Sequence, residues 1–285
     1  MFKKNKVCLI VEGGGFKTAF TAGVLDSFLG VGKTNFDGFM GVSGGSIAIS
    51  YFLSKQYRFC YRAIELLAKD QHFMQYKRTF GAEGIMDIDY LEKVSSQVVP
   101  FEKEKALQAI QEKDISFVAT NRRFGNPEYL VPNKENWINA VIASCTLPFV
   151  TKGKHKIKGK AYFDGGWSDP LPVKEAYRRG FNEVLVLRTS PKDIKTTQSW
   201  TDYFGSIYFS KRPELSECFS KCYLMYNAAV DFMISPPEGV TVNQIAPEKY
   251  LKSGTYSYNE KTIIEDYRNG LDQGMKYLMA NKSLI

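Results

Sequence analysis

Short apolar runs alternate with segments of helical periodicity along the first part of the chain. Residues 6–11 (KVCLIV) form an apolar run after one lysine, a pattern typical of a short buried strand. Residues 16–29 then repeat large apolar side chains every four positions, which predicts a helix. A second strand is expected over 36–42 and a second helix over 46–53. This strand–helix–strand–helix order favours an α/β fold with a parallel sheet and right-handed crossovers.

Further along the chain, turn residues separate the predicted elements. Residues 60–84 are aromatic and basic, and we expect irregular helices there that form one wall of a cleft. The pattern predicts further strands at 115–120, 128–131, 156–157, 160–163, 183–188 and 240–245, and further helices at 87–98, 101–112, 133–144, 200–233 and 260–279. With no internal repeat and no low-complexity linker, we expect one domain over 1–285, with a motif-bearing core at 7–190 and a helical C-terminal elaboration at 191–285.

An aromatic stretch in the last third has two interpretations. Its side chains are expected in the hydrophobic core, and an acyl-chain channel is the alternative. The residues concerned are Tyr203, Phe204, Tyr208, Phe209 and Phe219.

Composition narrows the class of protein. A chain of 285 residues with 44% hydrophobic and 14% aromatic residues is typical of a globular enzyme and not of a disordered or fibrous protein. No run reaches the roughly 18 apolar residues that cross a bilayer, and the apolar run at 7–11 is too short for the core of a signal peptide. We therefore expect a cytoplasmic protein. The five cysteines form no C-x-x-C pair and no zinc spacing, which favours buried free thiols.

The net charge of +8 concerns partners more than fold. Anionic membrane surfaces and nucleic acids both attract such a chain, but no nucleic-acid-binding motif is present, so we expect peripheral contact with an anionic membrane and no nucleic acid. Alternating lysines before Asp164 are interpreted first as a solvated sheet edge and second as a basic lip for anionic headgroups. These are Lys152, Lys154, Lys156, Lys158 and Lys160.

The candidate chemistry centres on a G-x-S-x-G pentapeptide. Gly41 and Gly45 flank Ser43 at the end of a predicted strand, where small residues permit a sharp strand-to-helix turn that lifts the hydroxyl clear of the backbone. Such a serine needs a base, and the chain has two histidines, His72 and His155. A serine–acid–histidine triad is disfavoured, because the α/β-hydrolase fold that carries it has several strands before the strand that leads into the serine, whereas here only one predicted strand comes earlier. We expect Asp164 to be the base, provided that burial raises its pKa.

Backbone donors for an oxyanion come from a second motif. Gly13, Gly14 and Gly15 lie where a strand opens into a helix, which leaves N–H groups free at the positive end of the helix dipole. Together with the N–H of Gly44 they are expected to bind the oxygen of a tetrahedral intermediate. Lys17, in the first helical turn, is a candidate contact for an anion or phosphate.

At these residues the chain resembles the patatin-like phospholipases. That family carries a G-G-G-x-[R/K]-G loop, a G-x-S-x-G elbow, an A-S-x-x-x-P segment and a D-G-[G/A] segment, and the sequence has counterparts beginning at Gly13, Gly41, Ala143 and Asp164. Thr18 departs from the family glycine. The resemblance implies a three-layer α/β/α sandwich with a mostly parallel central sheet and hydrolysis of phospholipid or other acyl-ester substrates. It also implies a Ser-Asp dyad with neither metal nor organic cofactor.

The hypothesis is therefore a serine lipid acyl hydrolase of phospholipase A or lysophospholipase type that forms an acyl-enzyme on Ser43. Two alternatives stay open at this point. One is a general carboxylesterase or thioesterase without preference for phospholipids, and the other is a non-catalytic lipid-binding protein that keeps the pocket without turnover.

Overall fold

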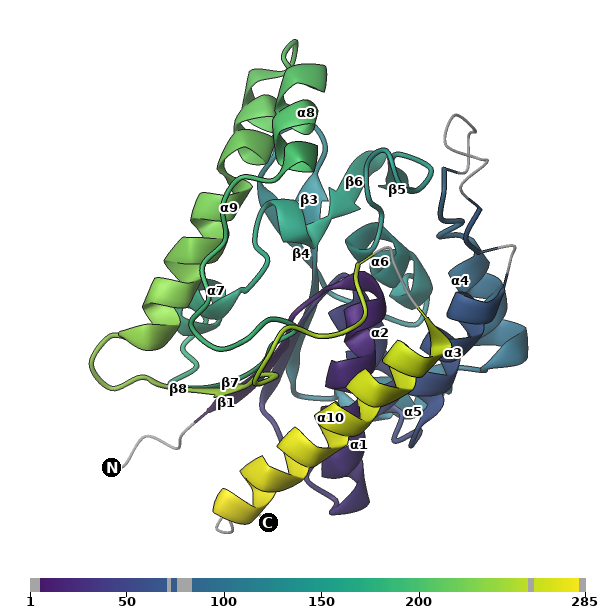
Figure 1. Cartoon of the computed structure of the whole chain (residues 1–285), viewed down its shortest axis with the longest axis vertical. Coiled ribbons are helices and arrows are strands. Elements are labelled where there is room, and N and C mark those ends of the chain that lie inside the picture. The colour runs from purple at the N-terminus through teal and green to yellow at the C-terminus, as the bar shows by residue number, and fades with distance from the viewer. Residues whose placement is uncertain (1–5, 71–72, 76–83, 256–258, 282–285) are drawn as a thin grey trace.

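The fold is given by a computed structural model that describes residues 6–70, 73–75, 84–255 and 259–281 (Figure 1). Within these residues eight strands form one sheet, in the order β5-β6-β3-β2-β1-β7-β8, with β4 paired to β3. The strands are β1 (Val7–Val11), β2 (Gly38–Val42), β3 (Asp114–Asn121), β4 (Pro127–Leu130), β5 (His155–Ile157), β6 (Lys160–Asp164), β7 (Glu183–Leu187) and β8 (Thr241–Ile245).

The helices follow the predicted order, with two differences. The stretch at 200–233 is divided into two helices because the chain turns just before Pro213, and the stretch at 87–98 ends in a π-helical turn, Val94–Val98. The α-helices are α1 (Thr18–Gly30), α2 (Gly44–Leu53), α3 (Phe59–Lys69), α4 (Tyr90–Lys93), α5 (Lys103–Ala109), α6 (Trp137–Ser144), α7 (Val173–Arg178), α8 (Trp200–Tyr208), α9 (Pro213–Ile234) and α10 (Glu260–Ala280). None of the helices in the described ranges is long and apolar enough to span a bilayer.

The centre of the sheet is parallel and one edge is antiparallel. β1 pairs in parallel with β2 and β7, and these two pair in parallel with β3 and β8. β4 and β6 pair antiparallel with β3, and β5 pairs antiparallel with β6. The expected α/β class with a mostly parallel sheet is confirmed.

Alternation along β1 explains the three layers. Leu9 and Val11 point into a core shared with α1, α2, α3 and α10, whereas Cys8 and Ile10 point into a second core shared with α7 and α9. All four side chains are buried, as expected for a parallel strand covered on both faces. Figure 1 shows α10 lying across α1 on one side and α9 running along the other.

Glycines allow α10 to pack closely on α1. A Cβ atom at Gly23 would collide with the carbonyl oxygen of Tyr267, and one at Gly270 would collide with the carbonyl oxygen of Phe20. Beside this contact the Tyr267 hydroxyl donates a 2.8 Å hydrogen bond to the buried carboxylate of Asp26. The C-terminal helix is thereby joined to the first helix by both backbone proximity and a polar contact.

The expectation for the aromatic stretch is wrong in part. Phe209 and Phe219 are buried together with Phe163. Tyr203, Phe204 and Tyr208 are instead exposed on α8. The pattern alone does not separate these cases, because α8 buries its small residue, Gly205, against the ring of Phe219 and turns its large residues outward.

We predict that Gly23→Ala destabilises the protein by about 1–3 kcal/mol or more, because the added methyl forces α10 away from α1. The free energy of unfolding is measured by chemical denaturation. Gly30→Ala is the matched control on the same helix, since a Cβ there meets nothing within 4 Å. Equal stabilities of the two variants would contradict the close packing.

Candidate active site

The glycine loop follows β1 and is anchored by the end of β7. The Glu12 carboxylate accepts hydrogen bonds from the Thr189 backbone N–H at 2.6 Å and from the fully buried Arg188 Nε at 3.1 Å. The Thr189 hydroxyl donates to the carbonyl oxygen of Gly13 at 2.7 Å. In the described part of the chain, the N–H groups of Gly13 and Gly14 donate to no acceptor. The loop therefore offers free backbone donors in a fixed position.

Ser43 lies at a strained turn between β2 and α2. Its φ of 52° is in the left-handed region, which is unusual for a residue with a Cβ. The turn is tight because a Cβ at Gly41 would meet the backbone of Ser46, and one at Gly13 would come within 2.7 Å of the Ser43 Cβ. The Ser46 hydroxyl donates to the Ser43 carbonyl oxygen at 2.6 Å. The glycines around the pentapeptide are thus explained by close approach of the backbone.

Asp164 ends β6 and is buried, with 3% of its surface exposed. Its Oδ1 accepts a 2.8 Å hydrogen bond from the Gly166 N–H. Its Oδ2 is buried and has no hydrogen-bond partner among the described residues. Ser43 lines the same cavity as Asp164, and its hydroxyl lowers the pKa of Asp164, but within the described ranges no hydrogen bond joins Ser43 to the free Oδ2. Such contacts are often loose in the free enzyme and tighten with substrate.

The A-S-x-x-x-P segment, which begins at Ala143, joins Ser43 and Asp164. Ser144 is the last residue of α6. Its hydroxyl accepts a hydrogen bond from the Ser43 N–H at 2.9 Å and donates to the Val118 carbonyl oxygen at 2.7 Å. Two residues later the Thr146 carbonyl oxygen accepts from the Asp164 N–H at 2.7 Å. The A-S-x-x-x-P spacing was the available signal, but it does not state which backbone groups are bound.

Burial dominates the electrostatics of Asp164. It raises the pKa of this carboxyl to about 6, while the Ser43 hydroxyl and the Gly166 N–H act in the opposite direction. Beside it, the buried Cys145 thiol lies 3.8 Å from the Ser46 hydroxyl, and burial raises the pKa of that thiol above its usual range. Cys145 is therefore held as a neutral thiol and not as a competing nucleophile.

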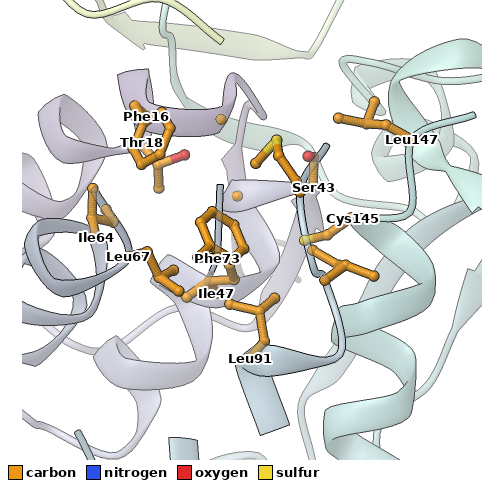
Figure 2. A pocket seen from close by; sticks show the side chains of 14 residues that line it. Phe16, Thr18, Ser43, Ile47, Ile64, Leu67, Phe73, Leu91, Cys145 and Leu147 are labelled. Atoms are coloured by element: carbon orange, nitrogen blue, oxygen red, sulfur yellow. The ribbon is translucent and has the colours of Figure 1, made fainter. Parts of the chain in front are cut away.

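Ser43 lies between two cavities of different character. The polar one is lined by Asp164, Lys17, Thr189 and the three loop glycines. The other cavity is lined almost wholly by apolar residues, including residues of α2 and α3. Figure 2 shows this cavity, with Ser43 at its rim and Ile47, Phe73 and Leu91 among its walls. Leu147 and Gly15 also line both cavities.

Thr18 and the other predicted residues also have definite places. Thr18 begins α1 and is 1% exposed; its Oγ1 has no hydrogen-bond partner in the described ranges, and a Cβ at Gly44 would collide with it. Gly44 is the first residue of α2, where N–H groups have no intrahelical partner. Thr18 thus fills the space where the family glycine would leave a gap, beside this candidate donor.

His155 does not join this group. His155 lies on β5, where its ring contacts Asn139 at 3.0 Å and lines neither cavity with Ser43. His72 lies outside the described residues. Within those residues no cluster of three or more His, Cys, Asp or Glu side chains is arranged to hold a metal ion.

Comparison with known proteins agrees with this geometry. A family model described as patatin-like phospholipase matches residues 9–177. The chain belongs to the patatin-like phospholipase family. Its C-terminal part, residues 212–285, matches a family described as a domain of unknown function (DUF6363). The family assigns this patatin-like protein to the esterase- or lipase-type hydrolases.

Two individual proteins extend the comparison across the whole patatin-like chain. It is 28% identical over 289 residues to the uncharacterized protein YjjU of Escherichia coli (strain K12), covering 100% of this chain and 80% of the other. The crystal structure of VipD from Legionella pneumophila matches with a TM-score of 0.51 at 14% identity, covering 98% of this chain and 67% of that one. The second likeness concerns the fold alone.

Asp164→Asn should stabilise the protein at neutral pH. A folded-state pKa raised to about 6 means that ionisation costs the folded state stability as pH rises from the unfolded value, near 3.8, to about 6. Asparagine avoids this cost, so the gain in unfolding free energy should be on the order of 2 kcal/mol at pH 7.5 and small at pH 4. Denaturation curves at both pH values measure it, with the exposed Asp272→Asn as control. A gain independent of pH would contradict the raised pKa.

Proposed function

We propose that the protein is a serine hydrolase of lipid acyl esters, of phospholipase A or lysophospholipase type, that works through a Ser43–Asp164 dyad. The observation that supports this most is the position of Ser43 at the junction of a polar cleft and an apolar cavity. A lipid ester has a polar group on one side of its carbonyl carbon and an acyl chain on the other. Both sides then find a matching environment when the carbonyl lies at Ser43.

The proposed reaction begins when the Ser43 Oγ attacks the ester carbonyl carbon while its proton passes to Oδ2 of Asp164. The carbonyl π electrons move to the oxygen, which accepts hydrogen bonds from N–H groups of Gly13, Gly14, Gly15 and Gly44. Collapse of this intermediate breaks the bond to the alcohol or lysolipid, which leaves with the proton from Asp164. The acyl group stays on Ser43. Asp164 then takes a proton from water as the water oxygen attacks the acyl carbonyl carbon. Collapse of this second intermediate breaks the bond to the Ser43 Oγ, which takes the proton back from Asp164, and the fatty acid is released.

The environment of Asp164 suits this role. A free aspartate, with a pKa near 3.9, is a weak base. The raised pKa of about 6 gives Asp164 more proton affinity and leaves it ionised at neutral pH. Its unpartnered Oδ2 is the oxygen free to accept the proton. No histidine is required in this scheme.

Lys17 and the surface charge support a phospholipid as substrate. Lys17 lines the polar cleft together with Ser43 and Asp164. An ammonium group there favours an anionic phosphate on the leaving side of the ester. The net charge of +8 likewise favours contact with anionic membranes.

A fluorophosphonate probe tests the nucleophile and separates the hydrolase from a non-catalytic lipid-binding protein. Wild type should be labelled and Ser43→Ala should not. Asp164→Asn should be labelled at least roughly 100-fold more slowly than wild type, because proton removal from Ser43 is impaired. Ser96→Ala, at an exposed serine, should be labelled like wild type. An unlabelled wild type would favour the binding protein. Turnover of short soluble esters or thioesters without any of phospholipids would favour the general esterase or thioesterase.

The pH profile tests the base. Because Asp164 must be ionised to accept the proton, kcat/KM for p-nitrophenyl butyrate should rise with pH, with a midpoint near 6, and be level above about pH 7. Replacement of both histidines, by His72→Ala and His155→Ala, should leave this midpoint in place. A profile that loses its inflection in the double variant would revive a histidine base.

A further inference from the structure

Helix α8 exposes a continuous stripe of aromatic side chains to solvent. Trp200, Phe204 and Tyr208 are 77%, 61% and 70% exposed and recur every four residues, so they lie on one face of the helix, with Tyr203 and Ile207 beside them. Ring centroids of Trp200 and Phe204 are 6.2 Å apart. Exposed apolar patches of this kind mark interaction sites. The fold does not need this face, because α8 packs on α9 through Gly205 and Phe209 on its other side.

The helix holds this stripe rigidly. A capping box begins α8, in which the Ser199 hydroxyl accepts from the Asp202 N–H and the Asp202 carboxylate accepts from the Ser199 N–H. Figure 1 shows α8 and the start of α9 at one end of the long axis of the molecule, beyond β3 and β6. The aromatic face is therefore displayed by an ordered helix at an extremity of the protein.

The end of the stripe contacts the chain segment that leads to the candidate active site. The Tyr208 ring contacts Phe149 edge to face at 5.0 Å, and Phe149 is itself 45% exposed. Two residues before Phe149, Leu147 lines both cavities that meet at Ser43. The α8 stripe therefore ends against Phe149, two residues along the chain from a residue that lines the cleft.

A basic cluster borders the stripe at the end of α8. Arg122, Arg123, Lys211 and Arg212 line one hollow beside the turn between α8 and α9. Tyr208 is the last residue of α8, and Lys211 and Arg212 follow it in the turn before α9, so the cluster and the stripe adjoin. Glu128, which is paired with Lys160, and Glu214 also line this hollow, but among the described residues none of the four cations forms an ion pair with a carboxylate. Their charge is available to an external anion.

The lysine ribbon (Lys152, Lys154, Lys156, Lys158 and Lys160) differs in part. Lys152 is paired with Asp89, and Lys160 is paired with Glu128 at 3.2 Å, whereas its other three lysines form no ion pair in the described ranges. Two of the five charges of the ribbon are thereby neutralised, and the cluster at the α8–α9 turn is the group of cations that borders the aromatic stripe. Tryptophan and tyrosine beside lysine and arginine are the combination that binds at the interface of an anionic bilayer.

We propose that the α8 stripe and its basic cluster form the surface by which the protein docks on an anionic phospholipid bilayer, an inference that rests on the proposed function for the identity of the substrate. Aromatic rings enter the headgroup region, the cluster of cations contacts lipid phosphates, and Phe149 and Leu147 continue the apolar path toward Ser43.

The binding experiment uses full-length Ser43→Ala protein, so that lipid is not consumed, with vesicles of phosphatidylcholine alone or with 30% phosphatidylglycerol. On anionic vesicles tryptophan emission should shift to the blue, and Trp200→Phe should remove most of the shift, since Trp137 is buried and Trp167 packs on the buried ring of Phe219. Trp200→Ala/Phe204→Ala should weaken vesicle binding at least tenfold. Tyr250→Ala/Met279→Ala, which removes two equally exposed apolar side chains elsewhere, should bind as before.

The charge is tested in the same assay. Lys211→Gln/Arg212→Gln should reduce binding to anionic vesicles, with little change on neutral ones, whereas Lys154→Gln/Lys156→Gln on the ribbon should have a smaller effect. The reverse order would overturn the assignment of the cluster. Absence of vesicle binding, or light scattering that shows a dimer broken by Trp200→Ala/Phe204→Ala, would also overturn it and make α8 a contact between two copies.

Failure of the proposed function is distinguishable from failure of docking. In the active protein, in which Ser43 is not substituted, Trp200→Ala/Phe204→Ala should lower the ratio of vesicle-lipid hydrolysis to p-nitrophenyl butyrate hydrolysis at least tenfold. Vesicle binding without any ester turnover would leave docking intact and reject the hydrolase. Turnover of the soluble ester without vesicle binding would keep the hydrolase and reject docking.

Discussion

The hydroxyl of Ser144 makes two hydrogen bonds on which the geometry of the site depends. It donates to Val118 on β3 and accepts from the Ser43 N–H, so the strained turn is fixed to the neighbouring strand. The same segment fixes the Asp164 backbone through Thr146. Strand β3 therefore sets the separation of Ser43 and Asp164, since it pairs with β2 on one side and with β6 on the other.

Local pattern was sufficient for much of this fold. Apolar runs and helical spacing located β1, β2, α1 and α2, because buried strands and helices impose different periods. The glycines beside Ser43 could also be interpreted from the sequence, since a position where a Cβ would collide with neighbouring atoms is restricted to glycine. Asp164 was a candidate base because its neighbours Gly165 and Gly166 allow a close approach, and its burial agrees with the expected rise of its pKa.

Contacts between distant segments were beyond the reach of such patterns. Nothing in the sequence around Ser144 states that its hydroxyl reaches Ser43. The exposed face of α8 was misassigned because aromatic residues usually enter a core, and only the packing of Gly205 on Phe219 decides which face is buried. The close contact of Gly23 with α10 likewise depends on a partner from the far end of the chain.

The parallel centre of the sheet has a consequence for any attempt to isolate the family segment. The patatin match ends at residue 177, before β7 begins, yet β1 is hydrogen-bonded along its whole length to β7. Arg188 adds to this join, since its guanidinium binds Glu12 after β1, Gln244 on β8 and Tyr226 on α9. A fragment cut at the family boundary would leave β1 with an open ladder of apolar residues along its bare side. Such an edge recruits other chains, so the excised segment would form aggregates instead of a smaller enzyme.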